Sequence, residues 1–156
     1  MKALWEAADF VRRVRRQLRF GELSRAPLQL LRLELRGDLA ECEWIARPPD
    51  PWDADLPAGM AERNQTLQAL RDAMRIREFI FEMLSEVRSA KFRVYRQPVA
   101  ESAELIITGT VAREDEPPLR VSSVAMRAKL CGFHFSLEDG VLQPLPPKDR
   151  SFTFAT

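Results

Sequence analysis

The chain contains few of the residues from which metal sites and disulfide frameworks are built. It has one histidine, His134, and two cysteines, Cys42 and Cys131, neither of them in a C-x-x-C pair. A zinc site made from cysteine and histidine alone would use all three residues and still lack a ligand. We therefore expect no metal site, and we expect reduced thiols, which are typical of a cytoplasmic protein.

Long hydrophobic runs are also missing. The N-terminal stretch "MKALWEAADFVRRVRR" meets charged residues too early to hold the apolar core of a signal peptide. No apolar run reaches the ~18 residues that a membrane-spanning helix requires. The formal net charge is +1, which indicates neither a nucleic-acid partner nor an acidic solvating chain. A cytoplasmic protein with no membrane or nucleic-acid partner is expected.

Motifs for catalysis or cofactor binding are not found. The sequence has no P-loop, no dinucleotide-binding fingerprint and no nucleophile elbow, so no cofactor is expected. Asp50, Asp53 and Asp55 lie close together, but they lack the glycine and the late glutamate of an EF-hand loop. An enzyme can work with two side chains and a backbone donor, so these absences leave enzymatic activity open.

The composition is that of a globular protein. Of the 156 residues, 46% are hydrophobic and 30% are charged, which is an ordinary balance for a folded domain. This length suffices for one domain with its own core, predicted to span residues 1–156. No internal repeat or low-complexity segment divides it.

A helix and a hairpin are predicted first. Apolar residues spaced by three and four predict an amphipathic helix over residues 1–20. Alternating residues predict a β-hairpin over residues 28–46, with its turn at Gly37-Asp38. On one face this register pairs Leu35 with Ala40, Leu33 with Cys42 and Leu31 with Trp44. On the other face it pairs Arg32 with Glu43 and Glu34 with Glu41.

A loop and a long helix follow the hairpin. Four prolines within residues 47–57 predict an irregular loop. The helix is predicted over residues 59–89, with Asp55 as its N-terminal cap. Its apolar residues cover nearly half of its circumference, which indicates a helix cradled by a sheet.

Strands are predicted for the rest of the chain. Antiparallel strands are expected within residues 91–146, at 91–96, 104–112 and 119–130, and then a hairpin with its turn at Asp139-Gly140. A change of apolar phase within 119–130 predicts a bulge at Ser122-Ser123. Residues 147–156 are expected to form an extended tail.

Together these elements predict an α+β fold. An N-terminal helix and a β-hairpin precede one long helix, which packs against a curved antiparallel meander sheet. Hot-dog and cystatin or NTF2-like folds share this general plan. Such folds host unrelated functions, so the plan alone does not indicate one.

Arg77 is the residue that departs most from its surroundings. Its helical neighbours Ala73, Met74, Ile80 and Phe81 are all apolar. An unpaired guanidinium is costly to bury, so this one has to be paired, to lay its stem over apolar atoms or to face a wet cavity. One interpretation is a salt bridge to a carboxylate of the sheet, from Glu101 or Glu104. The other is an anion receptor inside the cup formed by sheet and helix.

Two more residues are candidates for a binding site. His134 lies in the stretch "FHF" and is expected to point outward, with Phe133 and Phe135 pointing inward. Trp52 lies among prolines, where an aromatic side chain can cover a pocket, contact a second subunit or plug the end of the core.

Three functions are consistent with these features. The first is a small-molecule-binding module with an apolar pocket between sheet and long helix. Arg77, Phe81, His134 and Trp52 are its candidate ligand-binding residues, and its ligand would be a small amphipathic acid. The second is a homo-oligomeric structural or interaction protein, a homodimer that pairs through edge strands and the Trp52 loop. The third is an enzyme that acts on an acyl or aromatic acid through His134, Arg77 and an acid of the Asp50–Asp55 loop.

Overall fold

The computed structural model describes residues 2–49, 51–97, 102–118 and 120–146. Three α-helices, one short 3-10 helix and seven strands occur within these ranges. In chain order they are α1 (Lys2–Gln17), β1 (Gln29–Arg36), β2 (Leu39–Ile45), η1 (Pro51–Asp55), α2 (Met60–Met83), β3 (Ser89–Arg96), β4 (Glu104–Ala112), α3 (Val124–Leu130), β5 (Phe133–His134), β6 (Leu137–Glu138) and β7 (Val141–Leu142). The α+β class is confirmed.

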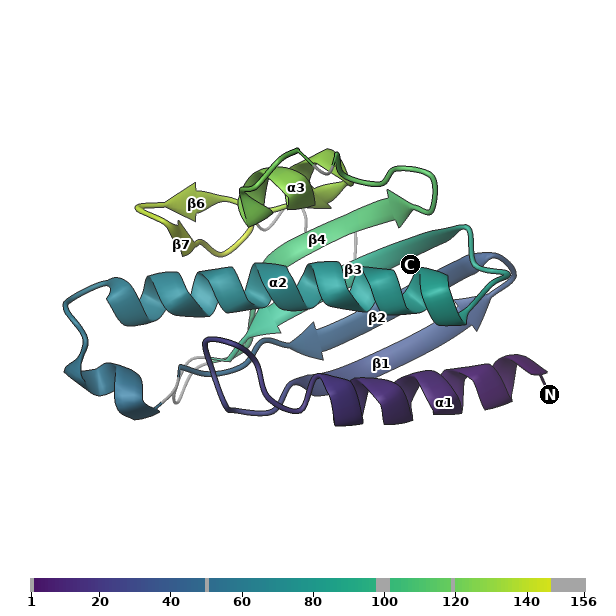
Figure 1. The fold of residues 1–156 in the computed structure, drawn as a ribbon, viewed down its shortest axis with the longest axis horizontal. Coiled ribbons are helices and arrows are strands. Elements are labelled where there is room, and N and C mark those ends of the chain that lie inside the picture. The colour runs from purple at the N-terminus through teal and green to yellow at the C-terminus, as the bar shows by residue number, and fades with distance from the viewer. Residues whose placement is uncertain (1, 50, 98–101, 119, 147–156) are drawn as a thin grey trace.

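The main sheet is mixed and open. Its strands lie in the order β1-β2-β3-β4-β5, and β6 and β7 form a separate two-stranded sheet. Neighbouring strands are antiparallel except for β2 and β3, which are parallel. Two adjacent parallel strands need a crossover connection, and α2 supplies it, as Figure 1 shows. The parallel pair was not predicted from the sequence.

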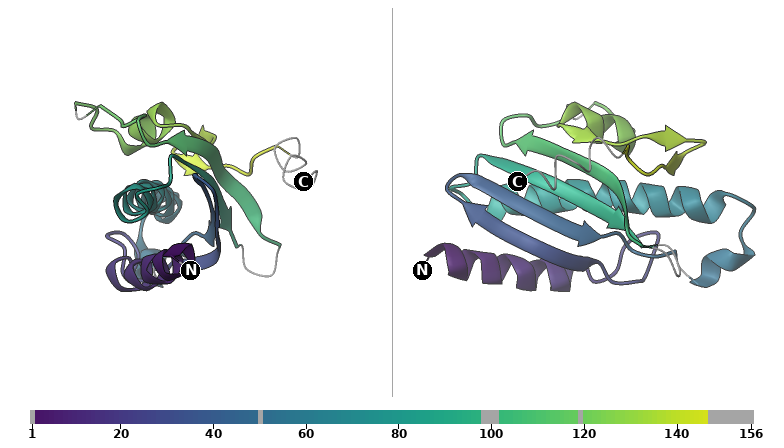
Figure 2. Two further views of the ribbon diagram at one scale, coloured as in Figure 1. Left: turned by 90° about the vertical axis from the view of Figure 1, so that its right-hand side faces the viewer. Right: turned by 180° about the vertical axis from the view of Figure 1, so that it is seen from behind.

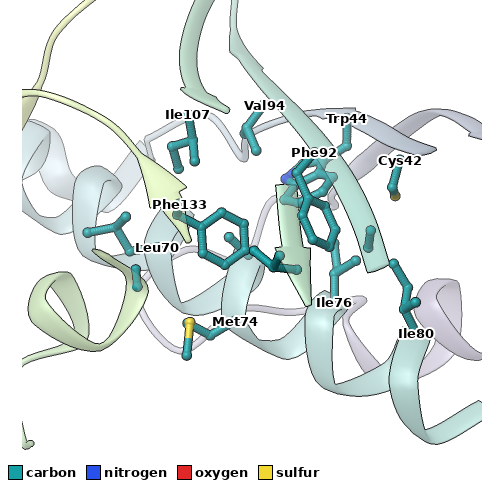
Figure 3. Packing of buried hydrophobic residues seen from close by; sticks show 14 of the residues in the cluster. Cys42, Trp44, Leu70, Met74, Ile76, Ile80, Phe92, Val94, Ile107 and Phe133 are labelled. Carbon is teal, nitrogen blue, oxygen red and sulfur yellow. The ribbon is translucent and has the colours of Figure 1, made fainter. Parts of the chain in front are cut away.

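Two helices cover the same face of this sheet. Figure 2 shows α1 and α2 side by side on one face, while the other face of β1 and β2 carries no helix. The space between sheet and α2 is filled by apolar side chains that form one buried cluster. At its centre Phe92 contacts Trp44 and Phe133, at ring-centre distances of 5.7 and 5.2 Å (Figure 3). The interior is therefore a packed core.

The first hairpin follows its predicted register over most of its length. Leu35 pairs with Ala40, Leu33 with Cys42, Arg32 with Glu43 and Glu34 with Glu41. The predicted pair of Leu31 with Trp44 is wrong, because Leu30 pairs with Trp44 and the register shifts between Leu30 and Arg32. Leu31 is the extra residue of this β-bulge and is 49% exposed.

The long helix begins where it was predicted to begin, but its capping residue and its C-terminal end differ from the prediction. The N-terminal cap is Gly59, and no side chain caps this end, so the assignment of Asp55 as the cap is wrong. Asp55 lies instead at the end of η1, where residues 51–55 form a 3-10 turn in place of an irregular loop. The helix ends at Met83 and not at 89, because Ser89 already belongs to β3.

Residues 124–130 form a helix and not the predicted strand. Ser123, expected in a bulge, is the N-terminal cap of α3, and its hydroxyl accepts a hydrogen bond from the backbone N–H of Met126. Val124, Ala128 and Cys131 recur at helical spacing on the side that faces the core, whereas Met126 and Leu130 are exposed. The alternating apolar residues that predicted a strand thus included two, Met126 and Leu130, that face solvent in the structure.

The remaining predictions for the C-terminal part are confirmed where the structure describes it. Phe133 and Phe135 are buried and His134 is exposed. The turn at Asp139 and Gly140 joins β6 to β7. The predicted tail, 147–156, lies outside the described residues. None of the described helices is both long enough and apolar enough to cross a membrane.

Candidate ligand-binding site

Arg77 is bound to backbone carbonyl groups. Its side chain lies on α2 and is 4% exposed. One terminal nitrogen donates to the carbonyl oxygen of Ala112 at 3.1 Å and to that of Asp115 at 3.2 Å. The guanidinium also lies 5.0 Å from the ring centre of Phe81, within the range of a cation–π contact. Arg77 thus ties α2 to the end of β4.

Among the described residues, Arg77 binds carbonyl oxygens and no carboxylate. Glu104 binds Arg96 instead, at 2.9 and 3.1 Å, so the interpretation that pairs it with Arg77 is wrong. Glu101 lies outside the described residues. The apolar residues around Arg77, such as Ile76 and Ile80, belong to the packed cluster of Figure 3.

The four predicted site residues do not come together. Arg77 and Phe81 are neighbours, but Trp52 lies in η1, beyond the opposite end of α2 (Figure 1), and is 76% exposed. Arg77 lies 17 positions after Met60, which corresponds to about 26 Å of helix and separates Arg77 from Trp52. His134 lies on β5, paired with Thr108 of β4, with its side chain exposed.

Residues that could bind a metal or react as nucleophiles are dispersed. Across the described ranges, no group of three or more His, Cys, Asp and Glu side chains is arranged to hold a metal ion. Cys42 and Cys131 are both free and buried. Burial raises the pKa of each thiol, and the charge of Arg77 only partly opposes this for Cys131. Both cysteines are therefore neutral thiols packed in the core.

One hollow lies beside α2, where α3 packs against this helix. This hollow, the α2–α3 groove, has a volume of about 530 Å³. Its lining comes from α2, from α3 with the two serines that precede it, and from Glu22. It comprises Glu22, Leu67, Arg71, Met74, Arg75, Glu78, Ser122, Ser123, Val124, Ala125 and Arg127. The groove thus combines apolar and charged side chains.

The three guanidinium groups that line the α2–α3 groove differ in the contacts that they make. Arg71 forms a surface ion pair with Glu22. The guanidinium of Arg75 lies 5.2 Å from the ring centre of Phe79. The Nε of Arg127 is buried and has no hydrogen-bond partner among the described residues. A buried N–H without a partner is costly. The Nε of Arg77 and the Nε1 of Trp44 are unpartnered in the same way, but of these three residues only Arg127 lines the α2–α3 groove.

The sequence did not indicate that these three arginines lie close together. Arg71 and Arg75 are four residues apart on α2, a spacing that places them on one helical face. Arg127 lies in the segment expected to be a strand, so its position beside α2 could not be inferred. The formation of α3, capped by Ser123, brings it there.

A second cluster of charges, around Arg47, is a structural element. The Arg47 guanidinium, 1% exposed, donates to Asp72 at 2.8 Å and to the carbonyl oxygens of Leu18, Arg19 and Ala26. Gln68 donates to the same Asp72 carboxylate at 3.0 Å. Burial raises the pKa of Asp72, and its hydrogen bond with Arg47 opposes that effect. With so many donors and acceptors satisfied internally, this cluster joins α1, α2 and the end of β2.

Comparisons with protein-family models, with curated proteins and with solved structures gave no match for this chain.

Proposed function

We propose that the protein is a small-molecule-binding module whose site is the α2–α3 groove. The observation that carries this proposal is the buried, unpartnered Nε of Arg127 in the wall of an open groove of about 530 Å³. That volume is within the range of small-molecule sites, which combine apolar walls with a few polar groups. The ligand is an amphipathic acid, such as an acyl chain or an aromatic ring that carries a carboxylate.

The lining residues fit both parts of such a ligand. A guanidinium can hold a carboxylate through two parallel N–H···O bonds, and Arg127 has donors to offer. Leu67, Met74 and Val124 supply apolar surface on which the body of the ligand can lie. Glu22 and Glu78 carry negative charge into the groove, so a ligand with one anionic group fits better than one with several.

Binding fits the groove better than catalysis does. His134 is not among its lining residues, and the hydroxyl of Ser123 is engaged in capping α3. A reducing, cytoplasmic location is part of the proposal, because Cys42 and Cys131 are both free.

The proposal is tested by thermal melting of the wild type and of Arg127→Gln with octanoate, benzoate and inorganic phosphate. A ligand that binds only the folded state raises Tm in a saturable way. We expect one of the two carboxylates to raise the wild-type Tm. We expect Arg127→Gln to weaken binding about ten-fold or more, because a charge-assisted hydrogen bond is lost.

Arg88→Gln is the matched control, because Arg88 is exposed and does not line the α2–α3 groove. It should bind as the wild type does. The proposal is rejected if no acid shifts the wild-type Tm, or if Arg127→Gln and Arg88→Gln respond alike. An equal response to phosphate in all three proteins indicates a nonspecific effect of ionic strength.

A further inference from the structure

The outer edge of β1 is an open strand edge. β1 is the first strand in the order of the main sheet, and no other strand among the described residues pairs with its free side. Figure 1 shows β1 at the border of the sheet, with α1 running beside it. Open edges present unpaired N–H and C=O groups that can bind another strand.

The hairpin register determines which backbone groups point outward. The two-residue turn at Gly37-Asp38 closes on the pair Arg36 and Leu39, whose backbone groups bond each other. Hydrogen-bonded and non-bonded pairs alternate in an antiparallel ladder, so Glu34 and Arg32 also bond to β2. Leu33 and Leu35 therefore direct their N–H and C=O groups away from β2, toward the open edge.

The side chains along this edge alternate in charge. Arg32, Glu34 and Arg36 lie on the face of the sheet that carries no helix, and they are linked to one another and to Glu41 and Glu43 by ion pairs. If a second β1 lies antiparallel with its two-fold axis at Leu33, each Arg32 faces the partner's Glu34. Centring the axis on Arg32 or on Glu34 instead would place like charges opposite each other, which is destabilising.

The helix-covered side of the edge is mostly apolar. A groove of about 360 Å³, the α1–β1 groove, runs between helix and strand and is lined by Ala7, Ala8, Val11, Arg15, Leu30, Leu31, Arg32 and Leu33. Leu31, 49% exposed at the bulge, would lie opposite the partner's Leu35. In a two-fold arrangement, one face of the edge would thus bring opposite charges together and the other would bring apolar side chains together.

We propose that a second copy of this chain docks on β1, antiparallel and two-fold symmetric about Leu33, to form a homodimer with a continuous sheet. A two-fold interface must be self-complementary, and the Arg32–Glu34 pairs formed twice across the axis satisfy this requirement. A centre at Leu35 would also pair opposite charges, but there Leu33 would meet the partner's Gly37 in the turn. The centre at Leu33 uses the longer stretch of strand.

Charge exchange tests both the interface and its register. Size-exclusion chromatography with light scattering should show a wild-type dimer whose population rises with protein concentration. Arg32→Glu alone and Glu34→Arg alone should each weaken the dimer about ten-fold or more, because each places two like-charge pairs across the axis. An equimolar mixture of the two variants should restore dimers, since every facing pair is again of opposite sign. Native mass spectrometry should identify these as heterodimers.

Lys91→Glu is the control, because Lys91 lies on β3 inside the sheet and should leave the dimer unchanged. Arg32→Glu also places a carboxylate opposite Glu43 of its own chain, so its Tm should fall. Recovery of dimers in the mixture therefore separates loss of the interface from loss of folding. A wild type that is monomeric at every concentration overturns the proposal. So does a dimer that is indifferent to both substitutions, or a mixture that fails to form heterodimers. If Glu34→Arg is rescued by Arg36→Glu and not by Arg32→Glu, the centre at Leu33 is wrong.

Discussion

Arg77 and Arg113 share the ring of Phe81, and the centre of each guanidinium lies 5.0 Å from the centre of that ring. Their hydrogen bonds run in opposite directions between two elements. Arg77, on α2, donates to Ala112 at the end of β4. Arg113, just after β4, donates to the carbonyl oxygens of Phe81, Leu84 and Val87, at and beyond the end of α2. The two arginines therefore form a reciprocal clasp between helix and sheet, which explains why α2 carries a charge within its apolar stripe.

Breaking either half of the clasp should destabilise the protein. Arg77→Met leaves the Ala112 and Asp115 carbonyls without their charged donor, at an expected cost of about 2–3 kcal/mol in the free energy of unfolding. Arg113→Met leaves three carbonyl oxygens near the end of α2 without their donor, so it should lower the free energy of unfolding by at least as much. Urea denaturation gives both values. Since the two residues share Phe81, the double variant should lose less than the sum of the single losses.

Arg75→Met is the control for the clasp. Arg75 lies over Phe79 at 5.2 Å, is exposed and has no hydrogen bond to a carbonyl among the described residues. Its loss should cost less than about 1 kcal/mol. Arg77→Met should also keep any response to carboxylates, because Arg77 does not line the α2–α3 groove. A variant that melts higher than the wild type would contradict the structural role of Arg77.

The buried pair of Arg47 and Asp72 should be far more sensitive than a surface pair. Asp72→Asn keeps the shape of the side chain but leaves the Arg47 charge buried and uncompensated. The expected loss is about 3–5 kcal/mol, read from urea denaturation. Replacing both residues by apolar ones should not rescue stability, because Arg47 also satisfies three backbone carbonyls.

Arg71→Met provides the comparison for this pair. Arg71 binds Glu22 at the surface, where ion pairs contribute at most about 1 kcal/mol. If Asp72→Asn costs no more than Arg71→Met, the Arg47 cluster does not hold the helices together.

The first hairpin could be predicted because its register is constrained on both faces. Only one register places Leu33 and Leu35 inward while it pairs Arg32 with Glu43. The bulge at Leu31 could not be predicted, since the choice between Leu30 and Leu31 depends on how α1 packs against β1. The parallel pairing of β2 with β3 was also missed. It follows from the path of α2 across the sheet, which is likewise a matter of tertiary packing.

The segment around α3 shows why the α2–α3 groove could not be predicted from the sequence. Val124, Met126, Ala128 and Leu130 alternate as in a strand, yet Val124, Ala128 and Cys131 also fit one face of a helix. Seven residues are too few for periodicity to decide between the two. The Ser123 cap and the packing against α2 favour the helix over the strand. The helix in turn determines the position of Arg127.

Two glycines should differ in how much an added methyl group costs. At Gly37, with φ +60°, nothing lies within 4 Å of an added Cβ, so Gly37→Ala costs only the left-handed backbone, about 1–2 kcal/mol. At Gly109, with φ +152°, the Cβ would lie 2.5 Å from the carbonyl oxygen of Gly132. Gly109→Ala should therefore cost clearly more than Gly37→Ala in urea denaturation. Equal costs would mean that β5 can move away from β4 freely.

The buried thiols should make stability fall at alkaline pH. Burial raises the pKa of Cys42 in the folded state, while in the unfolded chain a thiol ionises near a pKa of about 8.5. Above that pH the unfolded state releases a proton that the folded state retains, so the unfolded state binds fewer protons and unfolding becomes more favourable. The free energy of unfolding should fall by up to about 1.4 kcal/mol per pH unit for each thiol.

Urea denaturation of wild type and Cys42→Ala between pH 7.5 and 9.5 measures this slope, below the range in which lysine and tyrosine titrate. The variant should be less stable at pH 7.5, because Cys42 is fully buried in the core. Its stability should nevertheless fall less steeply than that of the wild type as the pH rises, because Cys131 is then the one buried thiol left. Parallel slopes would show that Cys42 ionises as readily in the folded protein as in the unfolded chain, and that its surroundings admit water.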